Sequence, residues 1–167
     1  MSIRLAREAE LSDVQQIDQA AGQMFNDVGM PEVSRLLWHF EALAACQRAD
    51  RLWVITEADD RPVGFLITDV IDGCLHIEQV SVDPGSARRG MGRALLDYAA
   101  ERAAAAGVPA VTLTTFAEVP WNAPYYSRCG FRVLDDAEVT AGLRAIRQRE
   151  DSIGMDRWRR VCMRRDL

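Results

Sequence analysis

The first fifty residues carry two helical hydrophobic patterns, which follow one short predicted strand at residues 3–6. The first helix, which Ser12 can cap, would bury a face made of Val14, Ile17, Ala21 and Met24. Pro31 suits the start of a second helix, whose apolar positions are Val33, Leu36, Leu37, Phe40 and Leu43. Two helices are therefore expected before the main strands.

Three predicted strands with turn residues between them follow, at residues 52–56, 63–71 and 75–82. The sequence Asp59-Asp60-Arg61-Pro62 predicts a turn, and Asp72-Gly73 predicts a tight hairpin. The sequence Asp83-Pro84-Gly85 ends the third strand. This part of the chain is expected to form an antiparallel meander.

A helix at residues 94–106 and a buried strand at 111–115 come next. Together with the strand at 75–82 they predict a right-handed parallel crossover. A short helix at 121–129, strands at 131–134 and 158–163, and a helix at 140–148 complete the pattern. We therefore expect an α+β (mixed α/β) fold, and a single domain over residues 1–167.

Composition and charge narrow the functional classes. The 167 residues are 49% hydrophobic and 27% charged, as is normal for a globular protein. A net charge of -5 argues against a nucleic-acid binder and would mildly attract a cationic amine. No stretch is apolar enough to cross a bilayer, and charges stand where a signal peptide needs an apolar run. We therefore expect a cytoplasmic protein that does not bind membranes.

The remaining composition gives little sign of special chemistry. The cysteines are Cys46, Cys74, Cys129 and Cys162, which are scattered and form no C-x-x-C pair, so we expect them to be buried and free. With two histidines in the chain, no metal site is expected. The basic run 157–160, followed by Arg164 and Arg165, is interpreted as the solvated face of a terminal strand.

The candidate chemistry begins at the loop Arg88-Arg89-Gly90-Met91-Gly92-Arg93, between a strand and a helix. Glycines let the backbone turn tightly and expose its N–H groups, and the helix start adds partial positive charge. The loop would therefore suit a pyrophosphate, with three arginines adding charge. It lacks the Gly-Lys-Ser/Thr of a Walker loop and the third glycine of a dinucleotide fingerprint, where Leu95 stands. Taken alone, it could also be a tight turn without a ligand.

The loop is one member of an ordered set of motifs. Val80-Ser81-Val82-Asp83-Pro84 precedes it, Ala94-Leu95-Leu96 follows it, and the block WNAPYYSRCGF occupies residues 121–131. This set resembles the GNAT superfamily of acyl-CoA-dependent N-acyltransferases. The loop is similar to that family's Q/R-x-x-G-x-G/A motif, and the block is similar to its N-x-x-x-Y-x-x-x-G-F motif. Ala87 stands where the family usually has Gln or Arg, which puts in doubt any side-chain contact from that position.

The resemblance implies a GNAT-like splayed mixed central sheet flanked by helices, with acetyl-CoA as cosubstrate and no metal. The Val80 N–H would contact the thioester carbonyl, and the Val82 backbone would contact the pantetheine. Asn122 would also touch the pantetheine arm, although a plain helix cap is its alternative role. The implied coenzyme-binding residues are Val80, Ser81, Val82, Arg88, Arg89, Gly90, Met91, Gly92, Arg93, Asn122 and Tyr126.

Acetyl transfer needs a base for the amine, whose pKa is near ~10.4, and a donor for the departing thiolate. Glu78 is the leading base candidate, because it lies on the strand just before the point where similar proteins splay two parallel strands. His76, on the same strand face, is the reserve base. Tyr126 is the leading acid, since the second aromatic of this block points at the thioester sulfur in similar proteins. Surface exposure of Glu78 and core packing of His76 and Tyr126 are the alternatives.

We therefore expect an N-acetyltransferase that moves an acetyl group to the primary amine of a small molecule by direct attack. Cys129 is expected to pack rather than to carry the acyl group. Residues 23–39 would wall the acceptor side, where most of Met24, Phe25, Met30, Trp38 and Phe40 are expected in the core. A peptide or protein N-acetyltransferase and a non-catalytic acyl-CoA-binding sensor are the alternatives. Homodimerisation, common among similar proteins, stays open.

Overall fold

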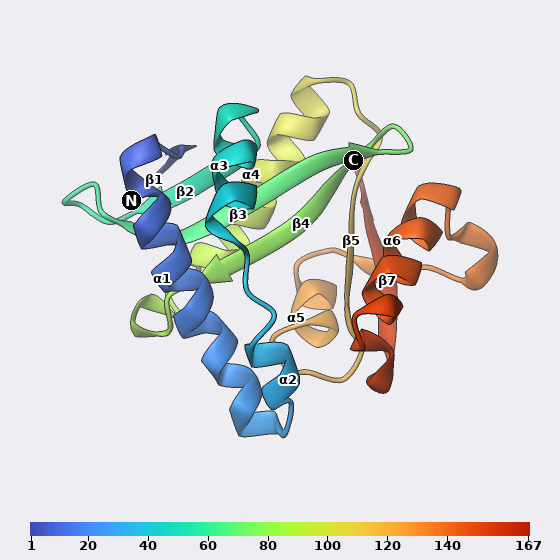
Figure 1. Ribbon diagram of the computed structural model, residues 1–167. Coiled ribbons are helices and arrows are strands. Elements are labelled where there is room, and N and C mark those ends of the chain that lie inside the picture. The colour runs from blue at the N-terminus through green and yellow to red at the C-terminus, as the bar shows by residue number, and fades with distance from the viewer. The chain divides into compact units, whose positions relative to one another are not determined.

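Seven strands form one sheet in the order β1-β2-β3-β4-β5-β7-β6 in the computed structural model, which describes residues 1–167 (Figure 1). The strands are β1 Ser2–Leu5, β2 Leu52–Thr56, β3 Pro62–Ile71, β4 Cys74–Val82, β5 Ala110–Phe116, β6 Arg132–Val133 and β7 Arg160–Asp166. Strands β4 and β5 are parallel, whereas β1–β2, β2–β3, β5–β7 and β6–β7 are antiparallel. The predicted mixed sheet and the predicted parallel crossover are confirmed.

Six α-helices accompany the sheet: α1 Leu11–Gly22, α2 Pro31–Ser34, α3 Phe40–Arg48, α4 Met91–Ala105, α5 Ala123–Arg128 and α6 Ala141–Ser152. Short 3-10 helices occupy Glu8–Glu10, Gln23–Val28, Pro84–Ser86, Asp136–Glu138 and Met155–Arg157. None of the helices is long and apolar enough to span a bilayer.

The chain divides into two compact units. The first unit contains Met1–Thr68 and Gln79–Tyr98, and the second contains Asp69–Glu78 and Ala99–Leu167. Strands β3 and β4 and helix α4 therefore contribute residues to both units. The expectation of a single domain stays a prediction.

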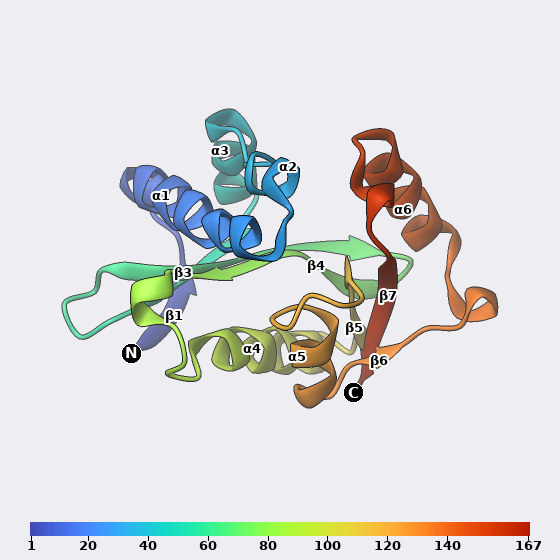
Figure 2. The same ribbon diagram turned by 90° about the horizontal axis from the view of Figure 1, so that it is seen from below.

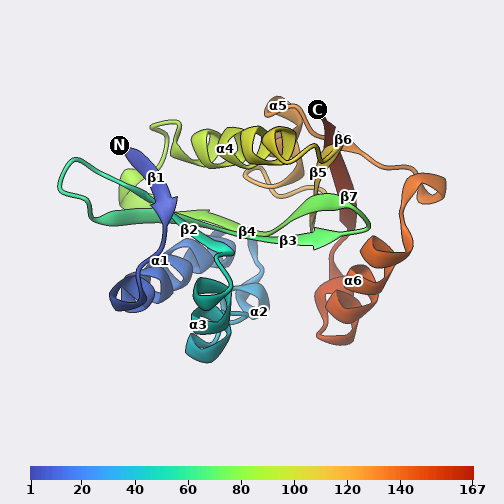
Figure 3. The same cartoon turned by 90° about the horizontal axis from the view of Figure 1, so that it is seen from above.

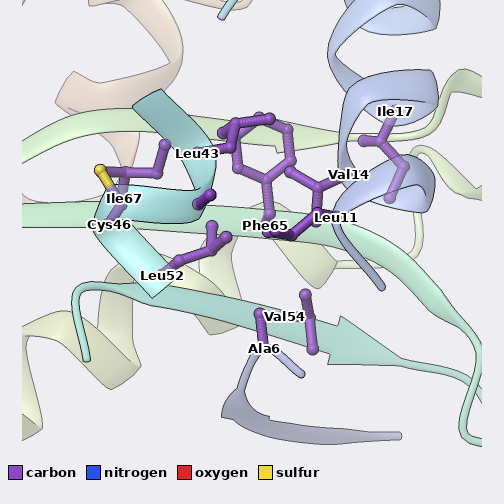
Figure 4. Close-up of a cluster of buried hydrophobic side chains, with 11 residues drawn as sticks. Ala6, Leu11, Val14, Ile17, Leu43, Cys46, Leu52, Val54, Phe65 and Ile67 are labelled. Atoms are coloured by element: carbon purple, nitrogen blue, oxygen red, sulfur yellow. The ribbon is translucent and has the colours of Figure 1, made fainter. Parts of the chain in front are cut away.

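The core of the first unit lies between helices and strands. Helices α1, α2 and α3 cover one face of β3, and the start of α4 lies on the other face (Figures 2 and 3). Leu11, Val14 and Ile17 of α1 pack in one cluster with Leu43 of α3 and Phe65 of β3 (Figure 4). Each such side chain, when fully buried, contributes roughly 1.5–3 kcal/mol to stability. This cluster fixes α1 on the sheet.

The second unit is built on the long antiparallel pair β5–β7. The register runs from Ala110↔Asp166 to Phe116↔Arg160. Helix α6 lies on one side of β7, and α5 lies on the other (Figures 2 and 3). Leu134, Leu143 and Cys162 form a small core under α6. Thr140 caps α6, since its hydroxyl accepts the Leu143 N–H.

The second predicted helix is broken, which corrects the sequence interpretation. Helix α2 ends at Ser34 and α3 begins at Phe40, so the apolar spacing does not mark one buried face. Leu36, Leu37 and Phe40 are 43%, 39% and 43% exposed. The Trp38 N–H donates to the carboxylate of Asp18 on α1 at 2.9 Å, so this tertiary hydrogen bond replaces a helical one.

The start of α1 also differs from its prediction. The helix begins at Leu11, so Ser12 lies inside it and is not the cap. The preceding 3-10 turn ends at Glu10, whose carboxylate accepts the Arg7 N–H at 2.8 Å and pairs with Arg4 at 2.7 Å. These contacts extend the structure one turn upstream. The hydrogen bond from Arg4 is the largest cause of the lowered pKa of Glu10.

Candidate active site

The predicted site residues fall in both units. Residues 80–82 and 88–93 belong to the first unit, and Glu78, Asn122 and Tyr126 belong to the second. His76, the reserve base, lies in the second unit as well. The loop residues and the candidate catalytic side chains therefore belong to different units.

The glycine loop of the first unit has an unusual backbone. Arg88 has φ 63° and Gly90 has φ 77°, so both occupy the left-handed region two residues apart. Left-handed geometry costs a non-glycine residue about 1–2 kcal/mol, and strain of this kind is concentrated at functional sites. Left-handed residues occur in backbone nests, in which successive N–H groups form a concavity for an anion.

Helix α4 begins directly after this turn and supplies further donors. Met91 is its first residue and is 3% exposed, so its side chain anchors the helix start in the core. The first intrahelical bond runs from the Ala94 N–H to the Gly90 carbonyl at 2.9 Å. The N–H groups of residues 91–93 therefore have no helical acceptor. They suit a phosphate at the positive end of the helix dipole.

The arginine side chains of the loop are exposed. Arg89 forms an ion pair with Glu57 at 2.5 Å, and Arg93 lies 3.8 Å from Asp97 on the next helical turn. Arg88 makes no ion pair. Because surface ion pairs contribute little to stability, these pairs would compete only weakly with an anionic ligand for the guanidinium groups.

Strand β4 presents backbone donors on one edge. The Asp83 N–H donates to the Val63 carbonyl of β3 at 2.7 Å. Because N–H directions alternate along a strand, the Val80 and Val82 N–H groups point away from β3. Gly64 of β3 lies close to β4, since a Cβ there would be 2.9 Å from the Ser81 carbonyl oxygen. Ser81 is buried, and its hydroxyl accepts from the Gln79 amide at 2.8 Å.

In the second unit, Glu78 follows the parallel pairing directly. Strands β4 and β5 pair from Leu75↔Val111 to Ile77↔Leu113. Glu78 is the next residue of β4 and is exposed. It therefore stands at the end of the paired segment with its carboxylate accessible to solvent, as a base acting on a solute needs.

His76, two residues earlier, is in a different environment. It is 2% exposed, and its Nδ1 lies 2.9 Å from the Thr112 hydroxyl. Burial lowers the pKa of His76 to about 4. Its lowered pKa and its burial make His76 a poor base for a solute at neutral pH, so Glu78, which solvent reaches, stays the leading candidate.

Tyr126 lies on α5 with its ring in the core. It is 8% exposed, and its ring contacts those of Phe131 and Tyr125 edge-on at 6.1 Å and 5.9 Å. Burial raises the pKa of Tyr126 above its ordinary value, and the neighbouring Tyr125 and Cys129 act in the same direction. The phenol is therefore protonated at neutral pH and can act as a donor.

Asn122 precedes α5 and is buried, but its side chain does not cap the helix. Its amide nitrogen donates to the Trp121 carbonyl at 3.3 Å, while its Oδ1 atom is buried without a hydrogen-bond partner. An orphaned buried oxygen costs free energy unless a ligand donor reaches it. A pantetheine arm carries amide N–H groups, so this atom fits the coenzyme A chain.

The sequence model of the acetyltransferase (GNAT) family matches residues 13–131. The match covers more than half of the chain, and the chain belongs to the acetyltransferase (GNAT) family. Both motifs described above lie inside the matched segment.

Several solved structures have a similar fold. The Mycobacterium tuberculosis protein Rv2747, in complex with CoA, has a TM-score of 0.71 at 21% identity, covering 100% of this chain and 99% of that one. N-acetylglutamate synthase from Neisseria gonorrhoeae, complexed with coenzyme A and N-acetyl-glutamate, has a TM-score of 0.75 at 17% identity. The likeness covers 99% of this chain and 35% of that one. The ribosomal-protein-S18-alanine N-acetyltransferase from Escherichia coli has a TM-score of 0.69 at 21% identity, covering 99% of this chain and 93% of that one. At these identities the likeness shows the fold.

Two polar features were missed from the sequence. Asp18 was not singled out, because one acid in a helical pattern is ordinarily a surface residue. Arg160 was assigned to a solvated strand face, but it is 8% exposed and pairs with Glu150 at 2.8 Å. The Arg160 guanidinium carbon also lies 4.4 Å from the centre of the Phe116 ring, which places the side chain in the interior. A basic run alone does not reveal which of its members is buried.

Proposed function

We propose that this chain transfers an acetyl group from acetyl-CoA to the primary amine of a small molecule by direct attack. The observation that carries the proposal is the loop before α4, where left-handed Arg88 and Gly90 precede a helix start whose first N–H groups have no helical acceptor. Membership of the family and the CoA complexes of similar folds support coenzyme binding. The reaction would take place in the cytoplasm, where the four buried free cysteines would stay reduced.

The proposed roles follow from the chemistry of each group. Residues 88–93 would hold the diphosphate through backbone N–H groups, and the Asn122 Oδ1 atom would accept from the pantetheine. Glu78 would take a proton from the incoming ammonium through water. The Val80 N–H would stabilise the oxyanion that forms as the amine nitrogen bonds to the acetyl carbon. An oxyanion donor of this kind is worth about 3–4 kcal/mol in a dry site.

Tyr126 would complete the reaction by giving its proton, or a hydrogen bond, to the departing thiolate. The raised pKa of the buried phenol supports the hydrogen-bond role, because it keeps the phenol neutral beside a thiolate of pKa about 8.5, and it makes full transfer of the proton less favourable. Cys129 is buried at 2% exposure, which supports direct transfer over an acyl-cysteine intermediate.

A thiol-release assay with acetyl-CoA tests the proposal. The panel contains amino acids, polyamines, aminoglycosides and short peptides, and each product is identified by mass spectrometry. Release of CoA that depends on a small amine, with an acetylated product, is the expected result. Turnover confined to peptides would make the chain a peptide acetyltransferase. Coenzyme binding without release from any acceptor would make it an acyl-CoA sensor.

A further inference from the structure

One face of the second unit joins Glu78 to an ionic cluster on α6. His76 and Thr112 are paired across β4 and β5, and their side chains meet at 2.9 Å. They therefore share a face, and alternation along each strand puts Glu78 and Thr114 on that face two residues further. Cys162 of β7 is paired with Thr114 and shares the face too.

The Thr114 hydroxyl connects this face to the ion pair between Glu150 and Arg160. It donates to Oε2 of Glu150 at 2.7 Å and accepts from Nη2 of Arg160 at 3.2 Å. Arg160 also binds both Glu150 oxygens, from Nη2 at 2.8 Å and from Nε at 3.2 Å. The charge of Glu150 is thus balanced by Arg160, whose side chain is 4% exposed.

Arg147 is a second arginine beside Glu150. It stands one helical turn before Glu150, and its Nη1 atom donates to the Arg160 carbonyl at 3.0 Å. Its Nε atom lies 3.7 Å from Glu150, beyond hydrogen-bond distance, and is buried without a hydrogen-bond partner. The Arg147 side chain is 27% exposed, so part of it reaches solvent.

Two further observations favour an anionic group at Arg147. Burial raises the pKa of the Cys162 thiol, and the nearby Arg147 guanidinium acts in the opposite direction. Residues 136–166, which include the acidic partners of Arg144 and Arg164, contain eight arginines against six acidic residues, although the whole chain is acidic. A second cation, as in a polyamine, would be repelled here, whereas a carboxylate would be attracted.

We infer that the acceptor is an amino carboxylic acid, whose carboxylate is received by Arg147 while its amine is presented to Glu78. This inference rests on the proposed function. A guanidinium binds a carboxylate through two parallel N–H bonds, which fixes orientation as well as charge. The ammonium first loses one proton to Glu78, the amine nitrogen bonds to the acetyl carbon, and the carbon–sulfur bond breaks. The departing thiolate takes a proton from Tyr126, and the second proton that the nitrogen loses restores the phenol through solvent. The products are an N-acetyl amino acid and CoA thiol, and the carboxylate is unchanged.

Matched acceptors give the first test. The twenty L-amino acids are compared with their amides and their decarboxylated amines in the thiol-release assay. We expect at least one acid to exceed both of its analogues about tenfold or more in kcat/KM, since a charge-assisted contact is lost in each analogue. Equal or better turnover of the amides and amines would overturn the inference while leaving the proposed function intact.

Matched variants assign the preference to Arg147. In Arg147→Met we expect KM for the preferred acid to rise about tenfold or more, with little change in kcat/KM for its amide. Arg144→Met is the control, because Arg144 lies on the same helix but contacts Asp136 at 3.4 Å. Arg147→Lys, which keeps the charge, should recover part of the preference. An unchanged KM in both Arg147 variants would overturn the assignment.

A binding measurement distinguishes failure of the proposed acetyl transfer from failure of the proposed carboxylate site. Amino acids and their amides are titrated calorimetrically into the full chain saturated with CoA, for the wild type and for Arg147→Met. If no acceptor is acetylated, the proposed function fails, yet binding of acids that Arg147→Met abolishes would still support the carboxylate site. Equal binding of acids and amides, or none of either, would overturn it. Thermal melts of both variants show whether they are folded.

Discussion

Buried titratable side chains are the distinctive feature at the scale of single residues. Tyr126, His76 and Asp18 are 8%, 2% and 5% exposed, and burial is the largest cause of the pKa shift of each. In every case burial disfavours the charged form. The phenol stays protonated, the imidazole stays neutral, and the pKa of the Asp18 carboxyl is raised.

Replacing Tyr126 by Phe tests the acid role. The ring packing against Phe131 is kept, so stability should change little, while kcat should fall by about 10²–10⁴-fold because the thiolate loses its donor. Steady-state kinetics at saturating acetyl-CoA measure the loss. Tyr125→Phe is the matched control on the same helix, and its kcat should stay near the wild-type value. Full activity in Tyr126→Phe would remove the assignment.

His76 should make stability sensitive to acid. Its folded pKa is about 4, below its ordinary value of 6.5, so only the unfolded chain takes up a proton between these values. The stability that comes from keeping His76 neutral is fully present above pH 6.5 and is lost as the pH falls toward 4. Between pH 7.5 and 5 the wild type should lose about 2 kcal/mol more than His76→Gln. Urea unfolding at several pH values checks this, and parallel curves would contradict it.

Asp18→Asn tests the opposite case. The asparagine oxygen can still accept the Trp38 N–H, but no charge is buried, so the variant should be more stable at pH 7. Because the pKa of Asp18 is raised in the folded state, wild-type stability falls as the pH rises through that pKa. The stability advantage of Asp18→Asn should therefore vanish in acid. Asp18→Ala leaves the Trp38 N–H unpaired and should cost about 1–3 kcal/mol. Thermal melts at pH 7 and pH 3.5 give both comparisons.

At the scale of elements, the turn before α4 is where local geometry and proposed function meet. Gly90 has φ 77° with nothing within 4 Å of an added Cβ, so a substitution there is strained by backbone conformation and not by contact. Gly107, at the other end of α4, has φ 71° and equally open surroundings. The two glycines differ in only one relevant way, which is their distance along the chain from the proposed diphosphate site.

This pair gives a controlled experiment. Gly90→Ala and Gly107→Ala should each lose about 1–2 kcal/mol of stability through left-handed strain. Only Gly90→Ala should also weaken CoA binding, by about tenfold or more, because the backbone N–H groups of the loop would turn. Thermal melts and calorimetric titrations measure the two effects. Equal CoA affinity in both variants would place the diphosphate elsewhere.

Local patterns predicted most elements because alternation and turn residues act within short segments. The strands at 52–56, 63–71 and 75–82 and the hairpin at Asp72-Gly73 appear within one residue of their predicted bounds. The break between α2 and α3 could not be predicted in this way, because the Asp18–Trp38 hydrogen bond joins residues twenty positions apart. The helical spacing from Val33 to Leu43 therefore continued through a segment that is not helical.

At the scale of the whole molecule, the family and the mixed sheet followed from the order of motifs, and both are confirmed. The environments of side chains were harder to predict from the sequence, because burial depends on contacts between distant segments. Arg160 meets Glu150 and Thr114 only once α6 and β7 are folded, so its burial is invisible in the basic run. Asn122 was predicted at the start of the helix 121–129 and is the residue before α5, but its unpartnered oxygen is evident only in three dimensions.

The central claim is that this chain binds coenzyme A, and calorimetric titration of acetyl-CoA into the folded protein tests it most directly. Two temperatures are needed, because a binding enthalpy can pass through zero at one of them. The account predicts saturable binding of one acetyl-CoA per chain, competed by CoA and weakened in Gly90→Ala. Absence of binding heat at both temperatures, in protein shown to be folded by circular dichroism, would contradict it.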